Sequence, residues 1–247
     1  MLTNFRADLH IHTVLSPCAE LEMLPGLIIS AAEMAGLDLI AICDHNSCEN
    51  TQAVIEASLA SSIKVMPGIE VQTLEGVHIL CIFENMDCAL QMQNIVYRAL
   101  PDLDMPDKQI NEQLVVDSVD EFVNYCTKPI AMPVSIDLNT ICIFAAELGG
   151  LIIPSHIDRH GSGLLDVLGY LPEDIQFDAL ELSANANLER IVFEHPEIAG
   201  QTFIRSSDAH WLWAIGEHPI VMRMLHRTLN EMKMAFNNKD GRSVEIA

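Results

Sequence analysis

The chain has 247 residues, half of them hydrophobic, and its 35 acidic against 13 basic side chains give a net charge of −22. This apolar content excludes general disorder, and the acidic charge makes long nucleic acid an unfavourable partner, because cations are what bind a phosphate backbone. No stretch reaches the ~18 apolar residues of a membrane span, and no signal-peptide pattern begins the chain. Seven cysteines without a CxxC pair are typical of a reducing compartment, so we expect a cytoplasmic protein without membrane contact.

Short apolar runs, each long enough for one strand, alternate with segments of helical spacing. The strand-like runs are 8–12, 39–43, 65–69, 78–82, 151–155, 178–182 and 203–207, and the helical segments between them include 25–35, 51–61, 141–148 and 187–194. Nearly continuous apolar strands that alternate with helices predict an α/β protein whose parallel sheet is covered on both faces.

Two stretches depart from this plan. Residues 84–111 have helical spacing followed by a Pro- and Asp-rich passage, and residues 112–134 have the pattern of a hairpin. We interpret 84–134 as an insertion in a single domain that covers residues 1–247, because candidate ligands lie on both sides of it. A further amphipathic helix is expected at about 225–238.

Six of the apolar runs end, or in one case begin, at residues that bind metals. The residues are His10 and His12, the pair Asp44-His45, Glu70, His78 (which opens its run), His156, and the pair Asp208 and His210. His10 and His12 are two positions apart on a strand, so both imidazoles can reach one ion, and Asp8 on the same face is expected to orient one of them. Each signal alone has an ordinary structural interpretation, such as a helix cap, a salt bridge or a core histidine. Together they indicate a hydrolytic metal cluster, since parallel α/β proteins place active sites at strand ends.

The ordered motifs DLHIHT, DHN, GIE, a histidine soon after, PSH and SSDAH resemble those of the PHP (polymerase and histidinol phosphatase) family. The likeness extends from Asp8 to His210 and is greatest for the stand-alone metal-dependent phosphoesterases of that family. It implies a distorted (β/α)7 barrel with two or three divalent ions, zinc, manganese or iron, at the carboxyl ends of the strands.

Position by position, the resemblance implies one ion held by His10, His12, Glu70 and Asp208. A second ion would be bridged by Glu70 and completed by His78 and His156. A third would use His45, His210 and one ligand from the loop that reads Ser16-Pro17-Cys18-Ala19-Glu20. Many family members have a histidine or aspartate in that loop. Here the Cys18 thiolate and Glu20 are the alternatives, and Cys18 is equally interpretable as a buried thiol beside a proline turn.

The reaction that this site implies is attack of a metal-bridging hydroxide on phosphorus. Asp208 is expected to accept the proton of the water, and Arg159 to clamp a phosphate oxygen. We favour Arg159 over Arg205, for which an ion pair is the simpler interpretation. Trp211 and Trp213 are interpreted either as a wall of the pocket or as core packing.

The sequence therefore predicts a hydrolase, a metal-dependent phosphoesterase acting on a small phosphorylated molecule. One alternative is a 5′ exonuclease or oligonucleotide phosphatase, and another is a non-catalytic metal-binding regulatory module. A metal-dependent amide hydrolase with a similar barrel would usually have a lysine at a strand end as a bridging ligand, and none of the expected strands ends in lysine. Specificity is expected to come from the 84–134 insertion and the loops around Arg159.

Overall fold

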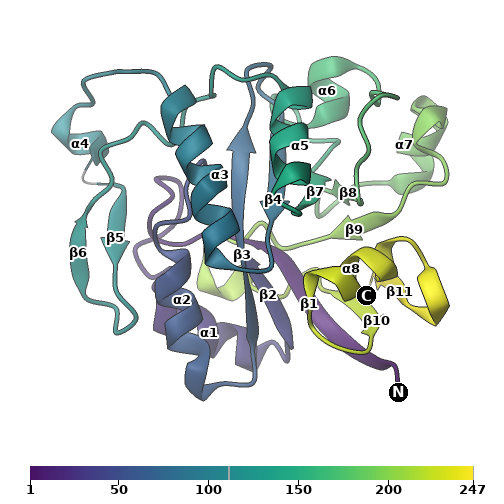
Figure 1. Ribbon diagram of the computed structural model, residues 1–247, viewed down its shortest axis with the longest axis horizontal. Helices are drawn as coiled ribbons and strands as arrows, with labels where there is room; N and C mark the ends of the chain where they lie inside the picture. The colour runs from purple at the N-terminus through teal and green to yellow at the C-terminus, as the bar shows by residue number, and fades with distance from the viewer. Residues whose placement is uncertain (111, 247) are drawn as a thin grey trace.

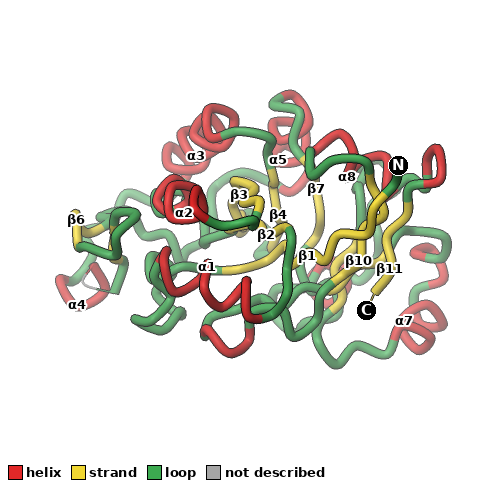
Figure 2. The backbone as a smooth tube through the Cα atoms, turned by 90° about the horizontal axis from the view of Figure 1, so that it is seen from below, coloured by secondary structure: helices red, strands yellow, loops and turns green. Residues whose placement is uncertain are grey.

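Seven strands form one curved mixed sheet in the computed structural model, which describes residues 1–110 and 112–246. Their order across the sheet is β11-β10-β1-β2-β3-β4-β7, and β8 and β9 form a separate parallel pair (Figures 1 and 2). The strands are β1 (Thr3–Ile11), β2 (Leu39–Ile42), β3 (Lys64–Gln72), β4 (His78–Ile82), β7 (Leu151–Pro154), β8 (Leu180–Leu182), β9 (Phe203–Arg205), β10 (Ile220–Met224) and β11 (Ser243–Ile246). The predicted α/β class with a distorted, barrel-like sheet is confirmed.

The expectation of a wholly parallel sheet is wrong. Strands β1, β2 and β3 are parallel, whereas β4 runs antiparallel to β3, and β10 and β11 add two antiparallel strands beyond β1. The reason for β4 is its connection, because residues 73–77 are too few for the crossover that a parallel neighbour needs. The turn closes with Thr73 N–H donating to the carbonyl of Val77, and Gln72 pairs with His78.

Most helices lie where the helical spacing predicted them, but the short helices at 107–110 and 164–168 were not predicted. They are α1 (Pro25–Met34), α2 (Thr51–Ala57), α3 (Met86–Ala99), α4 (Asp107–Ile110), α5 (Leu138–Glu147), α6 (Leu164–Leu168), α7 (Leu188–Glu194) and α8 (Leu229–Phe236). Proline occupies the first turn of α1, and side chains of Asn85, Asp137, Asn187 and Thr228 cap α3, α5, α7 and α8. The helix expected at 225–238 is α8; the flanking strands β10 and β11 were not predicted. Among the described helices, none has the length and apolar character needed to cross a bilayer.

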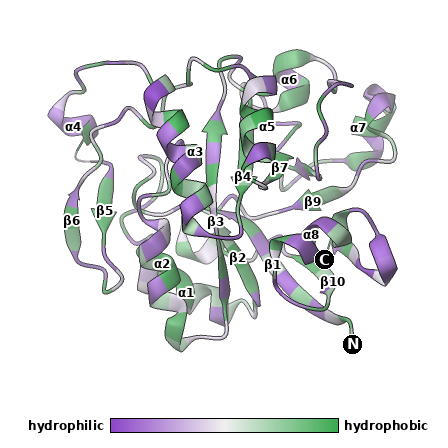
Figure 3. Ribbon diagram, in the orientation of Figure 1, coloured by the Kyte–Doolittle hydropathy of each residue, from purple (hydrophilic) through white to green (hydrophobic). Residues whose placement is uncertain are grey.

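The core is divided by the sheet. One buried cluster fills the concave side and is closed at one end by α8; it includes Ala7, Leu39, Met66 and Leu80 from successive strands. A second cluster packs α3 and α5 against the outer face of β3, β4 and β7, and a third packs α1 and α2 against β1 and β2. The hydrophobic residues of β3 are visible in Figure 3. Because both faces are covered, the polar side chains of the sheet gather at the carboxyl ends of β1–β3.

The segment 84–134 contains α3 and a hairpin of β5 (Leu114–Val116) and β6 (Phe122–Tyr125), as the spacing predicted, together with the short helix α4, which was not predicted. Residue 111 of this segment lies outside the described residues, as does residue 247 of the chain. The hairpin stands at the edge of the molecule, beside α4 and apart from the main sheet (Figure 1).

Candidate metal centre

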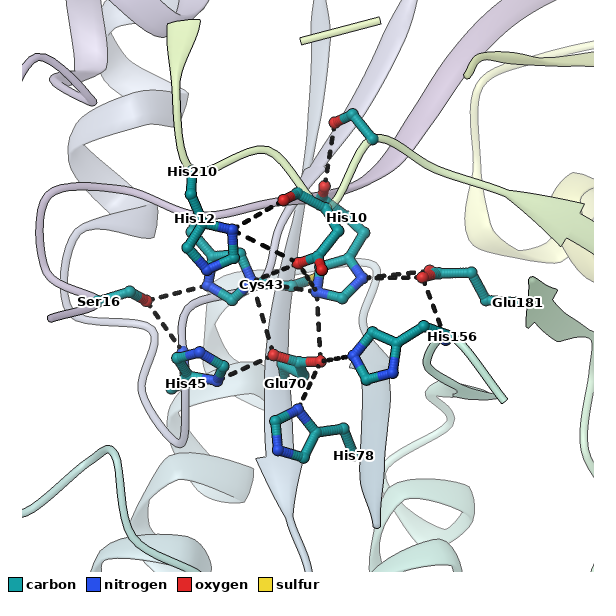
Figure 4. Close-up of polar contacts among 12 residues, drawn as sticks. His10, His12, Ser16, Cys43, His45, Glu70, His78, His156, Glu181 and His210 are labelled. Carbon is teal, nitrogen blue, oxygen red and sulfur yellow. Dashed lines mark hydrogen bonds and ion pairs between the residues drawn. The ribbon is translucent and has the colours of Figure 1, made fainter. Parts of the chain in front are cut away.

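All eight predicted histidine and carboxylate ligands converge at the carboxyl ends of the parallel strands (Figure 4). They come from β1 and its following loop, the loop after β2, the strand β3, the start of β4, and the loops after β7 and β9: His10, His12, His45, Glu70, His78, His156, Asp208 and His210. His78 opens its strand because β4 is antiparallel, so its first residue lies at the same edge as the ends of its neighbours.

Glu70 is the centre of the cluster. Its Oε1 lies 3.0 Å from Nδ1 of His78 and 3.2 Å from Nε2 of His156, and its Oε2 lies 2.9 Å from Nδ1 of His45. Nε2 of His10 and of His12 follow at 3.4 and 3.5 Å. The carboxylate is almost wholly buried, and an isolated bridge pairs its backbone with that of His45. A carboxylate with donors on both oxygens can bridge two ions.

A compact group of donors is formed by His10, His12 and Asp208. The two Nε2 atoms are 3.1 Å apart, and Oδ1 of Asp208 lies 3.3 Å from the first and 3.2 Å from the second. Zn–N bonds of about 2.0–2.1 Å in tetrahedral geometry separate the ligand atoms by about 3.3–3.4 Å. The spacing of these three atoms therefore fits one shared cation.

In His10 and His12 the second ring nitrogen, Nδ1, is hydrogen-bonded to another side chain, which leaves Nε2 free to bind an ion. Nδ1 of His10 lies 3.1 and 3.2 Å from the two carboxylate oxygens of Glu181. Nδ1 of His12 donates to Ser16 Oγ (3.0 Å), whose hydroxyl donates to Asp44 (2.7 Å). Such partners fix the tautomer and the orientation of a metal-binding imidazole. Ser16 and Glu181 lie beside the rings in Figure 4.

Glu181 was not predicted as part of the site, although the sequence held a signal for it. It is the one charged residue within the apolar stretch Leu180–Leu182, and it is buried. The expectation that Asp8 orients a histidine ring is wrong. The pairing of β1 with β2 is irregular between Asp8 and Ile11, and the Asp8 carboxylate accepts backbone N–H groups of Ser207 and Gly216 instead.

A third group is formed by His12, His45 and His210. Nδ1 of His210 donates to the carbonyl of Asp208 (2.8 Å), which directs its Nε2 to Sγ of Cys18 at 3.0 Å. Cys18 is exposed, so the alternative of a buried thiol is wrong. The neighbouring side chains remove some water from the Cys18 thiol, which raises its pKa, but hydrogen bonds from His210 and His45 outweigh this and lower the pKa to about 6. Glu20, the other loop alternative, accepts a hydrogen bond from Trp211 at 3.2 Å.

The buried charges of the centre are balanced by protons on its histidines. Burial lowers the pKa of His10, but the charges of Glu181, Asp208 and Glu70 raise it well above its usual range. Burial likewise lowers the pKa of His45, and the charge of Glu70 outweighs this and brings it to about 10. Burial raises the pKa of Glu70, yet the surrounding imidazoles hold it well below its usual range. Divalent cations would replace these protons as the compensating charge, so the donor set fits a metal cluster.

Arg159 is placed at the open side of the centre. Its Nη2 lies 2.5 Å from Oδ2 of Asp208, and its side chain is 43% exposed. Arg205 instead donates to the carbonyls of Ala184 and Ala186, so it holds the loop after β8. His160, which follows Arg159, is exposed and pairs with Asp166.

The two tryptophans are not core residues. Their rings stack with centroids 5.8 Å apart, and the residues are 43% (Trp211) and 70% (Trp213) exposed. The Trp211 ring lies 6.0 Å from the ring of His210, so Trp211 borders the third group of donors.

Part of the strained backbone lies at the centre. Among the described residues, six non-glycine residues have positive φ, and three of them are at the centre: His156 (31°), Asp208 (49°) and Asn46 (50°), the last directly after His45. Left-handed backbone costs a non-glycine residue about 1–3 kcal/mol and persists where surrounding structure holds it. Here the bends turn two of the donor side chains toward the cluster.

Solved structures share the architecture of this chain. No protein-family model and no curated protein matches the sequence. The lesion-specific endonuclease PfuEndoQ from Pyrococcus furiosus superposes with a TM-score of 0.72 at 19% identity, over 98% of this chain and 58% of its own. A two-domain protein from Bacteroides vulgatus, described as containing a predicted PHP-like metal-dependent phosphoesterase, matches with a TM-score of 0.56 at 13% identity, over 99% of this chain and 65% of its own. The chain has the PHP-like fold.

A third structure has a length close to that of this chain. A protein from Bifidobacterium adolescentis described as a metal-dependent phosphoesterase matches with a TM-score of 0.58 and 16% identity, over 84% of this chain and 88% of its own. The present chain thus spans less than two thirds of the endonuclease and most of this third structure. At these identities the likeness establishes the fold, and the activity has to be argued from the site.

Proposed function

We propose that the protein is a metal-dependent phosphoesterase that hydrolyses a small phosphorylated molecule, a phosphomonoester or a phosphodiester. The observation that carries this proposal is the convergence of eight histidine and carboxylate donors around Glu70. Its support from other proteins is the shared fold of structures described as metal-dependent phosphoesterases and as an endonuclease. We also propose that residues 1–247 form a single domain in which 84–134 is an insertion, and that the protein is cytoplasmic, since all seven cysteines are free.

Two ions are assigned to the central donors. One would be held by His10, His12 and Asp208 with Glu70. The second would be held by Glu70, His78 and His156, with His45 on the other oxygen of Glu70. A third ion would use His45 and His210 together with the Cys18 thiolate, whose position beside His210 favours it over Glu20. Bound zinc, manganese or iron would supply Lewis acidity to the phosphoryl group and lower the pKa of water.

The chain's own residues have the remaining roles. Burial raises the pKa of Asp208, but nearby histidines hold it well below its usual range, which keeps the carboxylate in its charged form. We assign it the role of proton acceptor for the attacking water because of its position, since its Oδ2 faces the half-exposed Arg159 at the open side of the centre. The guanidinium of Arg159 reaches this same oxygen and has five N–H donors, which lets it turn to a phosphate oxygen when substrate enters. His10, His12 and Glu70 are buried, so their positions around Asp208 are fixed, and the substrate would enter from the open side of the centre.

An experiment with the metal-loaded protein tests this proposal. Phosphate release is measured with p-nitrophenyl phosphate, bis-p-nitrophenyl phosphate and a panel of phosphorylated metabolites, in the presence of Mn²⁺, Zn²⁺ or Fe²⁺. We expect turnover on at least one ester, and loss of turnover with most metal retained in Asp208→Asn. A metal-loaded protein that cleaves none of these esters would refute the proposal.

A nuclease acting on short strands is a second candidate, favoured by the likeness to the endonuclease fold over 98% of this chain. The net charge of −22 opposes binding to a long phosphate backbone. Adding a 5′-phosphorylated oligonucleotide to the panel separates the two candidates. Cleavage of the oligonucleotide with no turnover of small esters would support the nuclease.

A further inference from the structure

A second cavity adjoins the metal centre. The cavity at the centre has a volume of about 390 Å³ and is lined in part by Cys18, His45 and His78. An outer cavity of about 410 Å³ lies next to it, and Pro17 and Ala131 line both. The two cavities are therefore adjacent, and the outer one is lined mainly by residues 103–106, 109, 112 and 113 and by residues 129, 131 and 132. Its size falls within the range of small-molecule sites.

The wall of the outer cavity is fixed to the metal centre by Asn46. This buried residue follows His45, and its Nδ2 donates to the carbonyls of Ile130 (2.8 Å) and Met132 (2.9 Å). Its Oδ1 accepts the backbone N–H of Gln72 at 3.1 Å. The Asn46 side chain thus links three segments: residues 130–132, the strand β3 and the loop that contains His45. One wall of the outer cavity is therefore held in place directly by the residue that follows His45.

The chemistry of the outer cavity is apolar and acidic. Its lining includes Leu103, Met105 and Met132 together with three prolines, and its charged side chains are the carboxylates of Asp104 and Glu112. Among the described residues that line either cavity, none is a lysine or an arginine. A second phosphate placed here would meet like charges without a cation to balance it, whereas an apolar group would be removed from water.

We propose that the outer cavity binds the alcohol half of the phosphoester and selects substrates that carry one phosphate on an apolar, uncharged or cationic alcohol. This proposal rests on the proposed phosphoesterase activity and names its substrate class. The phosphate would lie at the metal centre beside Arg159, and the alcohol would extend through the inner cavity, past Pro17 and Ala131, into the outer one.

Three matched esters test the assignment: methyl phosphate, hexyl phosphate and hexane-1,6-diol bisphosphate. We expect kcat/KM for hexyl phosphate to exceed that for each of the other two by roughly tenfold or more, since burial of even one methylene is worth about that factor. Ala131→Phe should reduce the ratio of hexyl to methyl phosphate toward one by narrowing the passage. Ala199→Phe, an exposed control far along the chain in the segment after α7, should leave the ratio unchanged.

A variant that gains activity on the bisphosphate provides a second test, because a misfolded protein cannot produce a gain. Met132 is 40% exposed and lines the outer cavity, so Met132→Lys adds a cation where none is present. We expect this variant to raise kcat/KM for the bisphosphate relative to hexyl phosphate by several fold. Equal rates on all three esters, or a hexyl-to-methyl ratio that Ala131→Phe leaves intact, would overturn the assignment alone. Inactivity toward every ester would overturn the phosphoesterase proposal with it.

Discussion

Replacing Glu181 by Gln tests whether the unpredicted carboxylate controls the metal centre. Both oxygens of Glu181 lie 3.1–3.2 Å from Nδ1 of His10, and both side chains are buried, so the interaction is not screened by water. Gln has the same shape but no charge, and it offers one acceptor oxygen in place of two. Loss of a carboxylate partner of a metal-binding histidine costs about 10–100-fold in metal affinity or activity, which corresponds to about 1.4–2.7 kcal/mol.

The assay is a competition titration of the metal-free protein with a chelator of known affinity, followed by phosphate release from the metal-loaded variant. The affinity of the tightest ion should fall by about 10–100-fold in Glu181→Gln. Glu189→Gln is the matched control, since this exposed residue lies in the first turn of α7 and away from the centre. Wild-type metal affinity and turnover in Glu181→Gln would refute the reasoning that His10 needs this partner.

The remaining predictions concern the open side of the centre. Arg159→Lys should lower kcat/KM for a phosphomonoester by about 10–100-fold at unchanged metal content, because an ammonium cannot donate in a bidentate manner; an unchanged kcat/KM would exclude Arg159 from phosphate binding. In metal-free protein the pKa of Cys18 is about 6, which is lowered from the usual value, so the thiolate predominates above that pH. Alkylation of Cys18 by iodoacetamide, followed by peptide mass spectrometry, should therefore rise as pH passes through about 6 and level off by pH 8. A rate that still rises steeply above pH 8 would contradict the hydrogen bonds from His45 and His210.

The positions of most strands and helices followed from the sequence, but not the direction of every strand. Apolar runs identify strands wherever both faces are buried, as in β2 and β3. Direction depends on the length of the connection, and the five residues between β3 and β4 permit only an antiparallel return. The edge strand β11 was missed because it is short and half exposed, so the burial that produces an apolar pattern is absent there.

The types of ligand were predictable, whereas their grouping was not. His, Asp and Glu at the ends of apolar runs indicated a cluster, because several strand ends meet at one edge. Which atoms share an ion depends on side-chain rotation, and the structure places His12 beside His45 and His210 as well as beside His10. The alternation of residues along a strand also cannot predict a local shift in strand register. The displaced register after Asp8 directs its carboxylate to backbone N–H groups, and only the folded chain brings Glu181 to His10 across 171 residues.

The proposed phosphoesterase activity depends on ions held by the converging donors. Its most direct test is a titration of chelator-treated protein with Zn²⁺ or Mn²⁺, in which bound metal and phosphate release are measured on the same samples. We predict no turnover without metal, and a turnover that rises with bound ions and reaches a plateau at two or three ions per chain. Turnover in metal-free protein, or a fully loaded chain without turnover on any phosphoester, would contradict the account.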